Sequence, residues 1–124
     1  MANEITYAVS LSASKGGASI SSGTLSDTVD MTGVDMETGT QSIGTTNEAL
    51  AYNTTDITGD VHLVVKNLDA TNYVEIFKDN GNSHVLSKLN AGEACSLRRI
   101  PSASSLFARA NTAAVLIQFW ICEA

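Results

Sequence analysis

The sequence is poor in charge, in aromatic side chains and in proline. Of its 124 residues, 16% are charged, 6% are aromatic and one is proline. No segment approaches the roughly 18 consecutive apolar residues of a membrane-spanning helix, and the N-terminus lacks the basic start and apolar run of a signal peptide. We therefore expect neither a membrane partner nor export. Because 44% of the residues are hydrophobic, the chain is also too apolar to be disordered.

Basic residues are scarce and unevenly distributed. Eight acids and Lys15 give residues 1–60 a net charge of -7, whereas five acids and six bases give residues 61–124 a net charge of +1. Phosphate binding needs clustered Lys and Arg, so we expect no nucleic-acid partner. A surface with so few charges is typical of a protein that is partly covered by partners.

The residue types that usually carry chemistry are few and poorly spaced. Cys95, Cys122, His62 and His84 have no zinc-site spacing, and the absence of an export signal favours reduced, buried thiols over a disulfide. No serine has the Gly-x-Ser-x-Gly context of a nucleophile. Four acidic residues lie close together in the sequence and could hold calcium, but they lack the pattern of a regular calcium-binding loop: Asp27, Asp30, Asp35 and Glu37. We therefore expect no catalytic residue, no metal and no cofactor.

The first half of the chain predicts thin strands and long loops. Ser, Thr and Gly make up about half of residues 10–60, and Ser and Thr compete with helical hydrogen bonds. Residues 5–12 alternate strictly between large apolar and small side chains, which predicts a half-buried strand. Residues 47–52 are compatible with one helical turn.

The second half predicts a series of short strands. We expect strands over residues 61–66, 72–78, 83–89, 94–99 and 106–110, with turns at 79–82 and 90–93. In residues 113–122, apolar residues occur at both odd and even positions, so both faces of this strand should be covered. Either it is a central strand of a sandwich, or one of its faces meets a neighbouring subunit.

Four residues are candidate protein–protein contacts: Arg98, Arg99, Arg109 and Trp120. Successive strand residues point to opposite faces, so one of Arg98 and Arg99 should face the core side or a partner. The alternatives for this pair are one exposed and one ion-paired arginine, or arginines that meet acidic residues of the first half in another copy. Trp120 shares parity with Leu116 and Gln118 in an apolar strand, which favours its burial.

Three ordered sequence blocks lie within residues 61–124. They are VKNLDATNYVEI at 65–76, LSKLNAGE at 86–93 and FARANTAAV at 107–115, and a hydrophobic final strand follows them. This pattern resembles small structural proteins of tailed bacteriophages. The resemblance implies a β-sandwich frame and a role in the virion. It also implies that the Ser/Thr/Gly-rich first half is an arm that lies on a neighbouring subunit, as in capsid decoration proteins.

We therefore predict a single all-β domain over residues 1–124, a β-sandwich of jelly-roll type. Residues 1–60 would form an N-terminal strand and an extended arm with loops, and residues 61–124 a compact strand-rich core. The expected function is that of a capsid decoration or cement protein on the virion surface, assembled in the host cytoplasm. Its expected partners are the major capsid protein and two further copies of itself in a homotrimer. The alternative is a tail or fibre domain that binds a host glycan; an enzyme is not expected.

Overall fold

The computed structural model describes residues 4–31, 33–78, 84–101 and 106–123, which form antiparallel strands and no helix. The all-β prediction is therefore confirmed, and these residues contain no helix of a length and hydropathy that would cross a membrane. Two compact units divide the chain, residues 1–32 and 33–124. This division lies well before the change in composition near residue 60, because the Ser/Thr-rich strand β5 (Met36–Ile43) is paired within the second unit.

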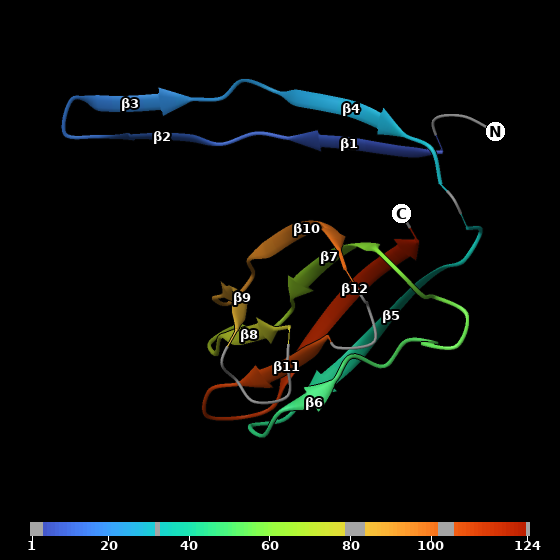
Figure 1. Ribbon diagram of the computed structural model, residues 1–124. Coiled ribbons are helices and arrows are strands. Elements are labelled where there is room, and N and C mark those ends of the chain that lie inside the picture. Colours follow the sequence, from blue (N-terminus) through green and yellow to red (C-terminus); the bar gives the residue numbers. More distant parts are fainter. Residues whose placement is uncertain (1–3, 32, 79–83, 102–105, 124) are drawn as a thin grey trace. The chain divides into compact units, whose positions relative to one another are not determined.

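The first unit is a long two-stranded hairpin (Figure 1). Strand β1 (Ile5–Val9) pairs with β4 (Leu25–Val29), and β2 (Ser12–Lys15) pairs with β3 (Ala18–Ser21). The tip is the two-residue turn Gly16-Gly17, where φ is 59° and 86°. Positive φ at both turn residues matches the right-handed twist of the flanking strands, and glycine adopts it without steric cost.

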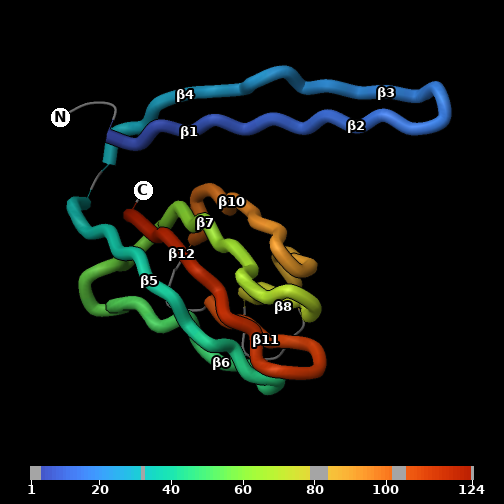
Figure 2. Tube along the Cα trace, turned by 180° about the vertical axis from the view of Figure 1, so that it is seen from behind, coloured from blue at the N-terminus to red at the C-terminus, as the bar shows by residue number. Residues whose placement is uncertain are grey.

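The second unit contains two four-stranded antiparallel sheets (Figures 1 and 2). In the first sheet the strand order is β10 (Ala94–Ile100), β7 (Val61–Asn67), β12 (Val115–Glu123) and β5. In the second sheet it is β6 (Glu48–Ala49), β11 (Phe107–Ala110), β8 (Val74–Phe77) and β9 (Val85–Leu89). Strand β12, with neighbours on both sides, is the longest strand of the described chain.

Each strand predicted in the second half has a counterpart in the structure, with boundaries that differ by a few residues. The predicted turn at residues 79–82 lies outside the described residues, as does the first residue of the strand predicted at 83–89. The helical turn predicted at 47–52 is wrong, because Glu48 and Ala49 form strand β6 and pair with Ala108 and Phe107. Pairing with a neighbouring strand therefore overrides the helical preference of a short Glu-Ala-Leu segment.

One hydrophobic core is shared by both sheets of the second unit. Strand β12 contributes Val115, Ile117, Phe119 and Ile121, β7 contributes alternate residues such as Leu63, and the second sheet contributes residues that include Val74, Ile76 and Ala108. Every second residue of these strands points inward, as the two-residue period of a strand requires.

The opposite face of β12 is only partly covered by the described residues of the second unit. Leu116 and Trp120 retain 46% and 41% of their accessible surface, while Ile117 between them has 0%. The expected burial of Trp120 is therefore wrong within one chain. The reason is that β12 packs on the core with one parity only, so its second apolar parity faces outward.

Candidate functional site

The outward side of β12 carries exposed aromatic and aliphatic side chains at the centre of the first sheet. We define the β12 face as Leu116, Gln118, Trp120 and Cys122. The strand register places Trp120 between Thr38 of β5 and Val64 of β7, and Cys122 between Met36 and His62. Met36 is 65% exposed, so it extends the apolar surface across the edge strand. Trp120, Cys122 and Met36 therefore give this side of the sheet an apolar region.

Basic residues adjoin the β12 face. Lys66 lies on β7 opposite Gln118, and the exposed Arg98 lies on β10, the next strand beyond β7. By strand alternation, no acidic residue lies on this side of the described strands of the first sheet. The face therefore combines an apolar centre with positive charge.

Arg98 and Arg99 are both exposed, so neither of them faces the core. The register of β10 against β7 shifts between Leu97 and Ile100, and Arg99 has a φ of 51°. Such a bulge inserts an extra residue into one strand and redirects its side chains. A non-glycine residue in the left-handed region also stores backbone strain, which the strand pairing on either side holds in place.

Arg109 is separate from the other candidate residues because it lies on the second sheet. Its Nη2 donates to Glu75 Oε1 at 3.1 Å, and its guanidinium lies 5.2 Å from the centre of the Phe77 ring. Arg109 and Glu75 are directly opposite each other on β11 and β8. This half-buried arginine therefore stabilises its own sheet. The structure brings Arg98, Arg99 and Trp120 into the first sheet and leaves Arg109 out of it.

The three sequence blocks at 65–76, 86–93 and 107–115 meet through hydrogen bonds between their turns. Asn67 is fully buried, and its Nδ2 donates to the carbonyl oxygens of Asn72 at 2.9 Å and Leu89 at 3.0 Å. The Tyr73 amide donates to Asn111 Oδ1 at 3.1 Å. The polar residues of these blocks hold turns together, so the blocks describe a frame and not a reactive site.

Asp69 holds the β7–β8 turn with its carboxylate. Its Oδ2 accepts the backbone amides of Asn72 at 2.6 Å and Thr71 at 2.9 Å. These two hydrogen bonds, that of Asn72 first, lower the pKa of Asp69 from its ordinary value. The aspartate of the Asn-Leu-Asp block is therefore a turn residue that stays ionised.

The two thiols are free and poorly suited to nucleophilic chemistry. Cys95 packs against the core, and burial raises its pKa against the opposing effect of a hydrogen bond with Ser87. Burial likewise raises the pKa of Cys122 on the β12 face. A raised pKa reduces the thiolate fraction at neutral pH, and the thiolate is the reactive form. Within the described part of the chain, no three His, Cys, Asp or Glu side chains lie close enough to hold a metal ion.

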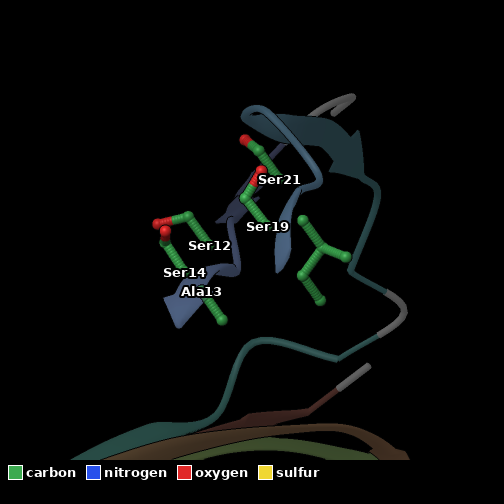
Figure 3. Close-up of a pocket in the computed structure, with 6 residues that line it drawn as sticks. Ser12, Ala13, Ser14, Ser19 and Ser21 are labelled. Atoms are coloured by element: carbon green, nitrogen blue, oxygen red, sulfur yellow. The ribbon is translucent and has the colours of Figure 1, made fainter. Parts of the chain in front are cut away.

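The hairpin of the first unit has two chemically different faces, which the sequence-based prediction did not find. We define the hairpin apolar face by its paired residues, which are Ile5 with Val29, Tyr7 with Asp27, Val9 with Leu25, Ala13 with Ile20, and Lys15 with Ala18. The other face carries small polar side chains. Figure 3 shows Ser12, Ser14, Ser19 and Ser21 on one side of the hairpin and Ala13 on the other. The shallow hollow between these residues is lined by six side chains, none of which titrates near neutral pH.

Comparison of the chain with protein-family models, with curated proteins and with solved structures gives no significant match.

Proposed function

We propose that this chain is a structural protein of a bacteriophage virion, which binds the capsid surface and stabilises the shell as a decoration or cement protein. The observation that supports this proposal is the apolar surface that the chain leaves exposed, on the β12 face and on the hairpin. Monomeric proteins seldom expose adjoining apolar side chains, whereas interaction surfaces do. The resemblance of residues 61–124 to phage virion proteins points in the same direction. In this role the protein acts by contact and carries out no reaction.

The finer architecture that we propose for the second unit is a jelly-roll-like β-sandwich. Its eight described strands pair first with eighth, second with seventh, third with sixth and fourth with fifth, that is β5–β12, β6–β11, β7–β10 and β8–β9. This order arises when one long antiparallel ribbon is rolled so that its pairs alternate between two sheets. The shared hydrophobic core supports the packing of the sheets on each other. Jelly rolls occur in viral capsid proteins and in lectins.

We assign the β12 face to the contact with the major capsid protein. Trp120 is the natural anchor of this contact, because large aromatic side chains dominate the binding energy of protein interfaces. The positive charge of Lys66 on the neighbouring strand, and of Arg98 one strand further, fits a capsid patch whose apolar centre is bordered by carboxylates. A homotrimer at a symmetry axis would engage the shell through three such faces at once, which raises avidity without any new kind of contact.

The test is binding of variants to purified shells that lack the protein. We expect Trp120→Ser and Leu116→Ser each to weaken co-sedimentation with the shells by about tenfold or more, since each removes a central apolar contact. Leu86→Ser is the matched control, because Leu86 is an exposed leucine of β9 on the second sheet. It should bind like the wild type.

All three variants should remain folded and lose similar, small amounts of stability, because the replaced side chains are partly exposed. Equal binding of the Trp120 variant and the wild type would contradict the assignment of the β12 face. Equal loss with Leu86→Ser would show that the effect is not specific to this face.

A second candidate function is glycan binding by a tail or fibre domain, and the exposure of Trp120 favours it. The indole is flanked by Thr38 on β5 and lies on the same outward side as Gln118, so a stacking surface has polar groups beside it. Glycan binding predicts that the protein binds one class of sugar on a glycan array. The same sugar should change the fluorescence of Trp120 in solution. The decoration role predicts no such change.

A further inference from the structure

The hairpin of residues 4–31 has no core of its own. It consists of two strands, and the apolar side chains of Leu11 and Ile20 remain 65% and 63% exposed. A two-stranded hairpin is marginally stable in water unless a further layer covers its apolar side. The hairpin apolar face therefore needs an occupant.

A bulge at Gly23 keeps the apolar residues of both strands on one face. Val9 and Ala13 are four residues apart, but their partners Leu25 and Ile20 are five apart. Side chains alternate with a period of two, so a regular strand would turn Ile20 to the serine side. Gly23 takes up the extra residue with a φ of 64°, and Ser22 Oγ accepts the Leu11 amide at 2.9 Å. The chain thus maintains a continuous apolar face across an irregular register.

The hairpin apolar face carries opposite charges at its two ends, so it is complementary to the same face of a second copy turned end to end. Lys15 lies at the tip and Asp27 lies near the base, with Leu11 midway between their positions along the first strand. When two hairpin faces are stacked antiparallel about Leu11, the first strands face each other. Lys15 of each copy then lies over Tyr7 of the other and next to Asp27, the strand partner of Tyr7. A parallel stack would instead bring like charges together. The partner that fits this pattern is a second copy of the chain.

We propose that the hairpin apolar face binds the same face of a second copy, with the two hairpins antiparallel and related by a two-fold axis. This contact rests on the proposed function, in which the protein associates with further copies of itself. It adds a second contact between copies, which joins neighbouring trimers. Val9 and Leu25 of one copy then cover Ala13 and Ile20 of the other. Facing sheets lie about 10 Å apart, which leaves room for one interdigitated layer of side chains.

The size of this contact predicts a weak association. Eight residues of strand span about 27 Å, and two strands are about 10 Å wide, so the stacked faces bury roughly 600 Å² in total. Specific stable interfaces bury about 1,200 Å² or more, so the hairpin contact belongs with weak ones. It contributes when many copies are held close together on a shell.

The test is complementation between two charge reversals in the full-length protein. Lys15→Asp alone places two carboxylates opposite each other at both ends of the contact, and Asp27→Lys alone places two ammonium groups opposite each other there. We expect each single variant to associate about tenfold more weakly than the wild type. An equimolar mixture of the two variants should recover wild-type association. In a mixed pair, the new aspartate at position 15 of one chain meets the new lysine at position 27 of the other. At the other end of the contact the unchanged Asp27 meets the unchanged Lys15, so both ends pair opposite charges. Lys15 and Asp27 of one chain are about 27 Å apart along the hairpin, so the recovery cannot arise within a chain.

The measurement is sedimentation equilibrium over a concentration series. The wild type should pass from a base mass to at least twice that mass with rising concentration. The base mass itself, monomer or trimer, tests the proposed homotrimer separately. Leu25→Ser should remain at the base mass, and Ala8→Ser on the opposite face should behave like the wild type. A wild type that never doubles, or a mixture no better than the single variants, would overturn the proposal. Loss of shell binding by Leu25→Ser without any doubling of the wild type would assign the face to the capsid instead.

Discussion

Asn67 illustrates how one buried polar side chain ties distant segments together. It donates two hydrogen bonds to backbone carbonyls, and its Oδ1 accepts the Asp69 amide at 2.8 Å. We expect Asn67→Ala to lower the free energy of unfolding by about 2–4 kcal/mol, because buried backbone groups lose their partners. Urea denaturation measures this loss. Thr46→Ala, at an exposed position, should change stability by less than about 0.5 kcal/mol. A small loss with Asn67→Ala would show that water replaces the side chain.

Arg98 and Arg99 are adjacent arginines with opposite backbone requirements. Arg99 has a φ of 51°, which glycine adopts freely, whereas Arg98 lies in a strand, where glycine costs about 0.5–1 kcal/mol. We expect Arg98→Gly to destabilise the protein and Arg99→Gly to be neutral or stabilising. Thermal unfolding of the two variants makes the comparison directly. If both variants lower the melting temperature equally, the bulge at Arg99 is not present in solution.

At the scale of elements, alternate residues of strand β12 are buried in the core or lie on the outward side of the sheet. Ile117→Ser should lower the free energy of unfolding by about 3 kcal/mol or more, whereas Leu116→Ser should lower it by less than about 1 kcal/mol, because only the first side chain is fully buried.

Trp120 is the only tryptophan in the sequence, so acrylamide quenching reports on it alone. We expect efficient quenching in the free protein and protection when the β12 face is bound. A fully protected Trp120 at low concentration would contradict an exposed face.

The strands of the second half could be predicted because turn residues separate short β-branched and apolar runs there. The exposure of the β12 face could not, since a strand that is apolar on both parities looks the same whether its second face meets its own chain or a partner. The hairpin remained hidden because the extra residue at Gly23 shifts the parity of Ile20 against Leu25. The positions of Arg98 and Arg99 depend on a bulge, which sequence alternation does not reveal.

At the scale of the whole molecule, the chain is a small β protein that leaves apolar side chains exposed on both of its units. The β12 face and the hairpin apolar face belong to different units. In the proposed role one contact holds the shell and the other holds a neighbouring copy.

The most direct test of this account is the heat resistance of the phage shell with and without the protein. Shells stripped of the protein should melt at a lower temperature than decorated shells, and re-addition of the wild type should restore the original melting temperature. Trp120→Ser should fail to restore it at concentrations at which the wild type saturates the shell. A melting profile that does not change on stripping and re-addition would contradict the proposal that this protein works by holding capsid subunits together.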